Sequence, residues 1–292
     1  MLVTFDAAAK INLLLDIRGT LPNGYHSLYM VMQSVSLFDR VTVEQTGSGK
    51  IELTCSRESI PCDSRNTAWK AAERFFEWTG IPNTGIHIHI EKRIPHEAGL
   101  AGGSADAAAV IRALDRIYSP ELRERDLCRI GVQVGADVPF CICGGTMIAQ
   151  GIGELLTPLP DMPDCPIVLA KPAQGVSTAA AYARYDETGS CRRQDEAGML
   201  AAIQGEDLHQ IACKLGNSFE QLIDTPQRVA IKSILRECGA IGSCMSGSGP
   251  TVFGLFDDGE RANRCLTEIR RVANDVFLCR PVKLGCNLIK VE

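Results

Sequence analysis

The stretch that decides the fold is residues 95–109, which read Pro-His-Glu-Ala-Gly-Leu-Ala-Gly-Gly-Ser-Ala-Asp-Ala-Ala-Ala. It follows Ile86–Ile90, where the alternation Ile-His-Ile-His-Ile predicts a β-strand. It leads into Ala107–Leu114, a segment with high helix propensity. A strand, a glycine-rich turn and a helix in this order leave backbone N–H groups unpaired at the positive end of a helix dipole. Such a helix start is a site for an anion.

The residues of this turn suit a phosphate group. Gly99, Gly102 and Gly103 allow positive φ and a close approach of the backbone to a ligand. Ser104 stands where the N-cap of the helix is expected, and its hydroxyl fits a backbone amide or a metal-bound phosphate. A plain tight turn with a serine cap fits the same residues. The Walker, G-x-G-x-x-G and G-x-S-x-G patterns are all absent here, so the loop is of a different type.

Composition bounds the class of protein. The chain has 292 residues, of which 45% are hydrophobic and 22% charged, as in ordinary globular proteins long enough for two domains. A net charge of −5 predicts neither a nucleic-acid partner nor an acidic membrane surface. No apolar run reaches the roughly 20 residues of a membrane span. The start, Met-Leu-Val-Thr-Phe-Asp, lacks the pattern of an export signal, so we expect a cytoplasmic protein.

Cysteine and histidine patterns do not indicate a metal or a disulfide framework. The 13 cysteines are odd in number and scattered, without any C-x-x-C, which predicts free thiols in a reducing compartment. His87 and His89 lie two residues apart on one strand face, but no third ligand follows at useful spacing. We therefore expect a solvent-facing stripe at these two histidines.

The first half of the chain reads as mixed strands and helices. We expect a helix over Asn66–Thr79, with Asn66 as the cap and Gly80 as the stop, and a second helix near Glu121–Val134. The strands expected here are Ala7–Ile17, Leu28–Leu37, Asp39–Gln45, Ile51–Cys55 and Gly144–Ala149. Strands and helices in mixed order favour an α+β fold over a doubly wound sheet.

A domain boundary is expected at Leu156–Pro166, where four prolines fall within eleven residues. The chain is therefore divided into a first domain, 1–157, and a second domain, 158–292. The elements expected in the second domain are strands at Ile167–Ala170 and Thr251–Phe256 and helices at Thr178–Tyr185, Asp207–Lys214, Pro226–Cys238 and Gly259–Ala273. This order suggests a two-layer domain of ferredoxin-like character.

Three further segments hold candidate site residues. In Gly135–Phe140, which reads Gly-Ala-Asp-Val-Pro-Phe, Asp137 stands on a turn from which a carboxylate can project into a cleft; an ordinary Asx turn fits too. Ser246–Gly249 is either a hairpin turn or a set of amides near a ligand. Lys10 lies within an apolar strand, so its ammonium either reaches the surface or faces a functional cavity.

Taken together, these segments resemble a known family. In chain order the matching motifs are Ala9-Lys-Ile-Asn-Leu13, Pro22-Asn-Gly-Tyr-His26, Ala98-Gly-Leu-Ala-Gly-Gly-Ser104, Gly135-Ala-Asp-Val-Pro-Phe140, Gly151-Ile-Gly-Glu154 and Met245-Ser-Gly-Ser-Gly249. Over residues 7–256 the chain resembles the 4-diphosphocytidyl-2-C-methyl-D-erythritol kinases, a family of the GHMP superfamily of small-molecule kinases. The glycine loop alone indicates the superfamily, and the Ala-Lys-Ile-Asn and Gly-Tyr-His segments narrow it to this family.

The resemblance implies a reaction and an architecture. The reaction is transfer of the ATP γ-phosphate to the tertiary 2-hydroxyl of CDP-methylerythritol, a step of the non-mevalonate route to isoprenoid precursors. The architecture is an α+β GHMP kinase with an N-terminal domain that holds ATP and a C-terminal domain that closes the substrate cleft. Mg²⁺ is expected to accompany ATP; its ligands stay unassigned, with Ser104 and Asp106 as the residues at hand.

The resemblance also assigns roles to residues. Lys10 and Asp137 are the catalytic pair, in which Asp137 accepts the hydroxyl proton or orients the nucleophile and Lys10 neutralises it and the γ-phosphate. Asn12, Tyr25, His26 and Tyr182 are expected to bind the substrate, with Tyr25 and Tyr182 on opposite faces of the cytosine. The residues expected to hold the ATP phosphates are Pro95, His96, Glu97, Ala98, Gly99, Leu100, Ala101, Gly102, Gly103, Ser104 and Ala105.

The loop departs from the family pattern at Glu97 and Ala101, where glycine is frequent. We expect the Glu97 carboxylate to point outward and Ala101 to take negative φ.

Three other functions stay open. A homoserine or mevalonate kinase would share the loop but should lack the Tyr25–His26 element. A non-catalytic nucleotide sensor is disfavoured by the presence of both Lys10 and Asp137. An RNA-binding module is disfavoured by the acidic balance of the chain.

Overall fold

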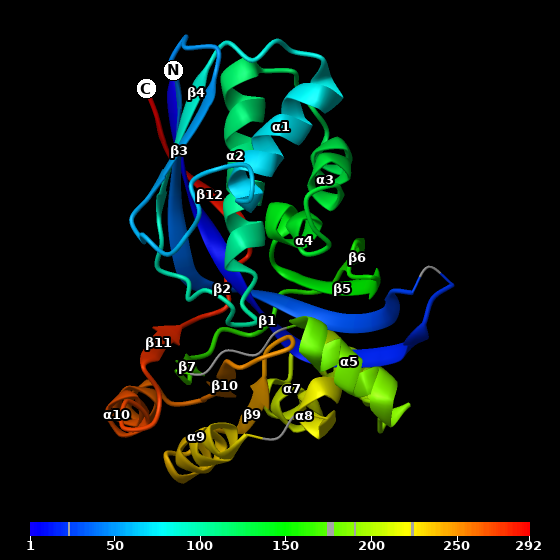
Figure 1. The fold of residues 1–292 in the computed structure, drawn as a ribbon. Helices are drawn as coiled ribbons and strands as arrows, with labels where there is room; N and C mark the ends of the chain where they lie inside the picture. Colours follow the sequence, from blue (N-terminus) through cyan, green and yellow to red (C-terminus); the bar gives the residue numbers. More distant parts are fainter. Residues whose placement is uncertain (23, 174–177, 190, 223–224) are drawn as a thin grey trace.

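The computed structural model describes residues 1–22, 24–173, 178–189, 191–222 and 225–292 (Figure 1). Asn23 of the Pro22–His26 motif and residues 175–177, which precede the helix carrying Tyr182, lie outside the described residues. The helices and strands form two sheet-based halves, one above the other in the view of Figure 1.

A large sheet forms the upper half. Its main path runs β12-β1-β2-β4-β3, with β5 on β2, β6 on β5 and β8 on β1. The strands are β1 (Leu2–Thr20), β2 (His26–Gln45), β3 (Ile51–Cys55), β4 (Ile86–Glu91), β5 (Thr146–Gly151), β6 (Leu155–Pro158), β8 (Gly216–Asn217) and β12 (Cys286–Val291). β1 and β2 pair antiparallel along most of their length, whereas β3 and β4 pair in parallel.

The break predicted between Leu28–Leu37 and Asp39–Gln45 is wrong, because β2 runs through both segments. Its pairing with β1 shifts register between Ala8 and Ala9 and again between Asn12 and Leu14. Such bulges let a long strand bend without ending. The bent pair therefore extends sideways from the upper sheet, between β5 and α5 (Figure 1).

Four helices cover one face of the upper sheet (Figure 1). They are α1 (Thr67–Thr79), α2 (Gly102–Tyr118), α3 (Glu124–Val132) and α4 (Val138–Cys143). The prediction for α1 is confirmed at both ends: the Asn66 side chain accepts from the Ala68 N–H, and Gly80 takes the left-handed conformation. In α2, buried alanines from Ala105 to Ala113 let the helix pack close to the strands.

The lower half is a smaller antiparallel sheet of order β11-β7-β10-β9 with α9 and α10 against it. Its elements are β7 (Ile167–Lys171), β9 (Gly242–Met245), β10 (Val252–Leu255), β11 (Asp275–Cys279), α9 (Pro226–Glu237) and α10 (Gly259–Ile269). This layout matches the predicted ferredoxin-like character. The other helices of this part of the chain are α5 (Thr178–Thr188), α6 (Glu196–Gln204), α7 (Leu208–Lys214) and α8 (Ser218–Leu222). In Figure 1, α7 and α8 lie beside the smaller sheet, and α5 lies beneath the end of the β1–β2 pair.

The chain crosses between the halves more than once. β12 returns from the lower sheet and pairs with β1, so the two termini lie side by side in Figure 1. The short β8 also pairs with β1. The boundary after Thr157 stays a prediction. None of the helices among the described residues combines the length and apolar character needed to cross a membrane.

Two smaller predictions concern cysteines and histidines. All 13 cysteines lie in the described part of the chain and are free thiols, as predicted. His87 and His89 share the face of β4 opposite its buried isoleucines. The hydroxyl of Thr54 on β3 hydrogen-bonds to a ring nitrogen of each, over 3.0 and 2.8 Å. The two histidines therefore form the predicted stripe on the outer face of the sheet.

Candidate active site

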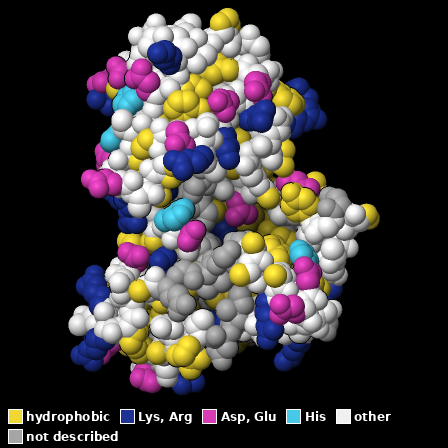
Figure 2. Space-filling model, viewed as in Figure 1, with side chains coloured by type: hydrophobic (Ala, Val, Ile, Leu, Met, Phe, Trp, Pro, Cys, Tyr) yellow, Lys and Arg dark blue, Asp and Glu magenta, His cyan; other side chains and the backbone are white. Residues whose placement is uncertain are grey.

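A cavity of about 750 Å³ lies between the two halves. The space-filling view shows the molecule hollowed there (Figure 2). Its walls are the middle of β1, the loop between β4 and α2, the start of α1, the residues just before α4, the turn after β9, and aromatic residues at the start of β2 and on α5. The polar residues that line it include Lys10, Tyr25, His26, Lys92, Ser104, Asp106, Asp137, Tyr182 and Ser248.

The glycine loop starts α2 without a side-chain cap. Ala101, at the N-cap, takes φ 57°, in the left-handed region, and no side chain bonds to the first turn. Two predictions are therefore wrong: Ser104 is not the cap but lies within the first turn, and Ala101 does not take negative φ. The N–H groups of Gly102, Gly103 and Ser104 have no acceptor within the helix, since the first such bond runs from Ala105 to Ala101. The helix start offers these donors to an anion.

Contacts on both sides hold this loop in place. The Lys10 N–H donates to the Leu100 carbonyl over 3.1 Å, and the Ser246 hydroxyl donates to the Gly99 carbonyl over 2.8 Å. Gly99 has φ 73°, and a Cβ there would lie 2.1 Å from the Ser246 carbonyl oxygen. Only glycine fits this approach. The turn at Ser246–Gly249 is thus both a hairpin turn and a wall of the cavity.

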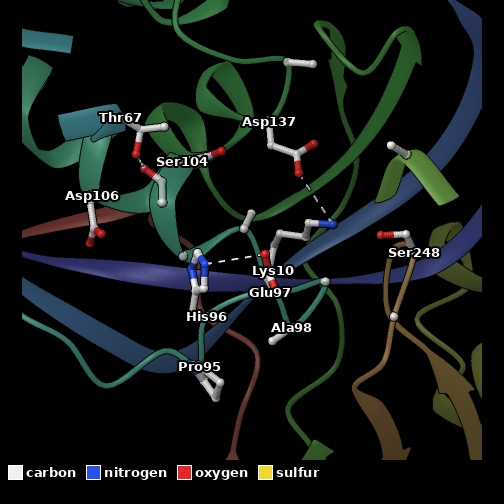
Figure 3. A pocket seen from close by; sticks show the side chains of 18 of the residues that line it. Lys10, Thr67, Pro95, His96, Glu97, Ala98, Ser104, Asp106, Asp137 and Ser248 are labelled. Atoms are coloured by element: carbon white, nitrogen blue, oxygen red, sulfur yellow. Dashed lines mark hydrogen bonds and ion pairs between the residues drawn. The ribbon is translucent and has the colours of Figure 1, made fainter. Parts of the chain in front are cut away.

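Not every residue of the predicted phosphate loop reaches the cavity. Leu100 and Ala105 are buried in the core and do not line the cavity, so they fix the loop by packing beneath it. The other nine residues from Pro95 to Ser104 line the cavity. The Glu97 side chain, which was expected to point outward, is 68% exposed, and its carboxylate lies 3.7 Å from His96 (Figure 3).

Lys10 and Asp137 face each other across the cavity (Figure 3). The buried Lys10 Nζ lies 3.7 Å from Asp137 Oδ2 and donates to Asn12 Oδ1 over 2.7 Å. Asp137 is the N-cap residue of α4, but its side chain makes no cap bond and is 32% exposed. Its carboxylate is thereby left to face the cavity. Asn12 is fully buried and is not in the lining, so in this structure it orients the ammonium.

The aromatic residues gather at the other end of the cavity. Tyr25 is 60% exposed at its rim. The His26 ring stacks on the Tyr182 ring with centroids 4.5 Å apart and 17° between planes. Phe219 meets Tyr182 edge-on at 5.0 Å. All three predicted aromatic residues therefore line the cavity. The Tyr182 ring, which was expected to stack on cytosine, stacks on the His26 ring in this structure.

A buried charge cluster beneath the loop was not predicted. Lys92 Nζ donates to Asp39 and, over 2.6 Å, to Asp106 Oδ2. Asp39 also accepts the N–H groups of Arg93 and Ile94, over 2.6 and 2.8 Å. The cluster ties β2 to the start of the loop and to the first turn of α2. No local pattern indicates it, because its members lie far apart in the sequence.

Burial and the neighbouring charges shift the pKa values of Lys92 and Asp106. Burial lowers the pKa of Lys92, but the carboxylates of Asp106 and Asp39 outweigh it and raise the pKa overall, so the ammonium stays charged. Burial also raises the pKa of Asp106, against the opposing charge of Lys92. Asp106 Oδ1 has no hydrogen-bond partner among the described residues. The Lys92 ammonium therefore stabilises the buried carboxyl groups of Asp39 and Asp106.

Replacing Lys92 by methionine should cost about 3–5 kcal/mol of unfolding free energy, because it strands Asp39 and Asp106 without their counter-charge. Urea unfolding followed by circular dichroism measures this. Lys50→Met, at an exposed lysine, is the matched control and should change stability by less than about 0.5 kcal/mol. Equal stability of Lys92→Met and wild type would show that the carboxyl groups need no cation.

The segment between β3 and α1 forms a further wall that the motifs did not indicate. Ile60, Pro61, Arg65, Asn66 and Thr67 line the cavity. The Thr67 hydroxyl donates to the Gly103 carbonyl over 2.7 Å, so α1 also steadies the first turn of α2. The sequence predicts α1 and its N-cap. It does not predict that the start of α1 lies beside the glycine loop, because that position depends on how α1 packs against α2.

Two family models match this chain, and both describe GHMP kinases. The family model described as GHMP kinases N terminal domain matches residues 66–145, and the model described as GHMP kinases C terminal matches residues 199–275. With the glycine loop and the Lys10–Asp137 pair, they define a GHMP kinase, a small-molecule kinase. The 4-diphosphocytidyl-2-C-methyl-D-erythritol kinase of Clostridium botulinum (strain Eklund 17B / Type B) is 41% identical over 96% of this chain and 100% of its own. The chain belongs to the family of 4-diphosphocytidyl-2-C-methyl-D-erythritol kinases.

Other relatives agree with this assignment. The enzyme of the same name from Exiguobacterium sibiricum is 43% identical over 96% of this chain and 98% of its own. A crystal structure of 4-(cytidine 5'-diphospho)-2C-methyl-D-erythritol kinase aligns with a TM-score of 0.80 at 33% identity, covering 95% of this chain and 98% of that one. A homoserine kinase from Cytophaga hutchinsonii, at 20% identity and a TM-score of 0.77, covers 99% of this chain and 97% of its own and shares the fold. The predicted family, α+β fold and kinase class are confirmed.

Proposed function

We propose that this cavity transfers the γ-phosphate of ATP to the 2-hydroxyl of 4-diphosphocytidyl-2-C-methyl-D-erythritol, with Lys10 and Asp137 as the catalytic pair. One observation carries the proposal: the two side chains face each other, 3.7 Å apart, between the helix start that suits phosphate and the aromatic end that suits a base. Phosphoryl transfer has a loose transition state, so positioning and charge supply most of the catalysis.

Asp137 and Lys10 have different roles at the reacting atoms. The Asp137 carboxylate accepts the proton of the attacking hydroxyl or orients it toward the phosphorus. The Lys10 ammonium stays beside that carboxylate and neutralises charge on the γ-phosphate oxygens in the transition state. Its bond to Asn12 holds it in place, because Asn12 is itself fully buried.

We assign the phosphates of ATP to the start of α2, where three N–H groups and the helix dipole favour an anion. Mg²⁺ prefers oxygen ligands and keeps several waters and phosphate oxygens. Ser104, whose hydroxyl lies at the cavity, fits as its ligand, whereas Asp106 is engaged by Lys92. Bound there, the metal ion would neutralise charge on the phosphates.

The acceptor test is a phosphotransfer assay of the purified protein with ATP and three alcohols: 4-diphosphocytidyl-2-C-methyl-D-erythritol, homoserine and mevalonate. We expect turnover with the cytidine substrate and at least about 10³-fold lower kcat/KM with the others, which lack a base for the aromatic end to bind. Efficient phosphorylation of homoserine or mevalonate would contradict the proposal.

Replacing Gly102 by valine should weaken ATP binding far more than substrate binding. Its φ is not in the left-handed region; instead, a Cβ there would lie 2.9 Å from the Ile94 side chain and 3.1 Å from Lys92 Nζ. The first turn of α2 would have to shift, and its N–H groups with it. We expect affinity for a non-hydrolysable ATP analogue to fall on the order of 10–100-fold by calorimetry.

The matched control for that variant is Gly259→Val. Gly259 is also the first residue of a helix, α10, and a Cβ there meets nothing within 4 Å. Both variants carry the same helix penalty for valine, but only Gly102→Val moves the loop. Nucleotide affinity unchanged in Gly102→Val would place the phosphates away from this helix start.

Replacing Tyr25 by alanine should raise KM for the cytidine substrate and leave KM for ATP nearly unchanged. Tyr25 lines the cavity, is 60% exposed, and is the proposed stacking partner of the base. Stacking of one base on an aromatic ring is worth about 1–3 kcal/mol, so a rise of roughly 5- to 150-fold is expected. Steady-state kinetics with each substrate varied measures both constants. An unchanged KM for the cytidine substrate would remove Tyr25 from the base site.

A further inference from the structure

One helix, α5, holds the His26 ring from three directions. Asp186 Oδ1 lies 2.7 Å from His26 Nε2, Tyr182 stacks on the ring, and Tyr185 meets it edge-on at 5.4 Å. The His26 side chain is 8% exposed, while that of Asp186 is 55% exposed. The ring is therefore fixed in orientation at the wall of the cavity.

The contact with Asp186 decides which ring nitrogen carries a proton. An ionised carboxylate can only accept hydrogen bonds, so Nε2 must be the N–H that donates to it. In a neutral imidazole, Nδ1 then has no proton and is an acceptor. Without Asp186, the two tautomers would be free to exchange, and Nδ1 would be a donor part of the time.

We propose that Asp186 is a positioning residue that holds His26 in the Nε2–H tautomer, so that Nδ1 accepts a hydrogen bond from the 4-amino group of cytosine and repels the 4-oxo group of uracil. The inference rests on the proposed function and deepens it by naming what selects the base. Stacking on an aromatic face tolerates every base, so Tyr25 alone does not discriminate. An acceptor held on a ring that is only 8% exposed does discriminate, because the wrong base leaves two acceptors facing each other.

The kinetic test compares the cytidine substrate with its uridine counterpart. In Asp186→Ala, the ratio of kcat/KM for cytidine over uridine should fall on the order of 10-fold, mostly through KM, with kcat for the cytidine substrate close to wild type. Asp186→Asn should keep most of the ratio, because its amide oxygen still accepts from Nε2–H. Glu187→Ala is the control: it removes the neighbouring carboxylate, whose partner is Arg184, and should leave the ratio unchanged.

A spectroscopic readout does not depend on turnover. The chain has five histidines, so the ¹⁵N imidazole signals of the free protein can be assigned with a His26→Gln variant. At pH 8 we expect wild type and Asp186→Asn to show the Nε2–H pattern at His26 and Asp186→Ala to show averaged tautomers. A purely structural role of Asp186 would lower thermal stability without moving these signals or the cytidine-to-uridine ratio.

The outcomes separate this inference from the proposed function. If Asp186→Ala keeps either the wild-type tautomer or the wild-type ratio, the role of Asp186 is refuted. If the wild-type protein does not phosphorylate the cytidine substrate at all, the proposed function fails. In that case the ¹⁵N spectra alone still decide whether Asp186 sets the His26 tautomer.

Discussion

The Asp137→Asn variant should lose roughly 10²–10⁴-fold in kcat while binding ATP as tightly as the wild type. An amide keeps the shape of the carboxylate but accepts no proton, and the proposed role is felt only in the transition state. The side chain makes no cap bond to α4 and is partly exposed, so the fold should not depend on it. Single-turnover kinetics and calorimetry with an ATP analogue measure the two quantities.

The control for this variant is Asp161→Asn, an aspartate whose partner is Lys283 on the surface. It should leave kcat and ATP affinity unchanged. A kcat within about threefold of wild type in folded Asp137→Asn would show that the carboxylate neither accepts the proton nor orients the hydroxyl, and the proposed mechanism would fall with it.

The second large effect is expected from Lys10→Met, which should lower kcat by about 10²–10³-fold. Methionine fills the volume of the lysine stem but removes the charge beside Asp137 and the γ-phosphate. The change also leaves the buried Asn12 Oδ1 without its donor, which should cost about 1–3 kcal/mol of unfolding free energy. Steady-state kinetics and urea unfolding on one preparation separate these two losses.

Asn12→Ala separates the roles further. It removes the bond to the ammonium but keeps the charge, so kcat should fall less than in Lys10→Met. If Lys10→Met loses stability but keeps a near-normal kcat, Lys10 is a structural residue.

The parts of the site that the sequence predicts are those carried by neighbouring residues. The strand, glycines and helix around Gly99 are adjacent in the chain, so local sequence is enough to predict an anion-type loop there. Asn66 and Gly80 delimit α1 in the same way, because a cap bond and a left-handed stop act within a few residues. Asp137 stands on its turn for the same local reason.

The parts that the sequence does not predict depend on contacts between distant segments. Ala101 takes positive φ because Gly99 and Leu100 are held by Ser246 and Lys10, and the chain must turn between those contacts and the helix. Propensity alone favours negative φ for alanine. The continuity of β2 depends likewise on its pairing with β1, whose bulges absorb the bend that a local pattern interprets as a break.

Lys92 and Tyr182 illustrate the same limit within the site. Lys92 reads as one more charged residue after a strand, and its two carboxylate partners come from β2 and α2. Tyr182 can be placed near the base by resemblance, but its stack on His26 is a contact between residues 156 positions apart in the sequence. Side-chain pairs of this kind become visible only once the packing is known.

The most direct test of the central claim is a crystal structure of the protein with a non-hydrolysable ATP analogue and 4-diphosphocytidyl-2-C-methyl-D-erythritol bound together. We predict phosphates on the N–H groups of Gly102, Gly103 and Ser104, and the 2-hydroxyl within about 2.6–3.2 Å of the Asp137 carboxylate. The cytosine should lie beside Tyr25 and His26, with the γ-phosphate between Lys10 and the hydroxyl. A complex in which the 2-hydroxyl lies away from Asp137, or the phosphates lie away from the start of α2, would contradict the claim that this one cavity performs the transfer.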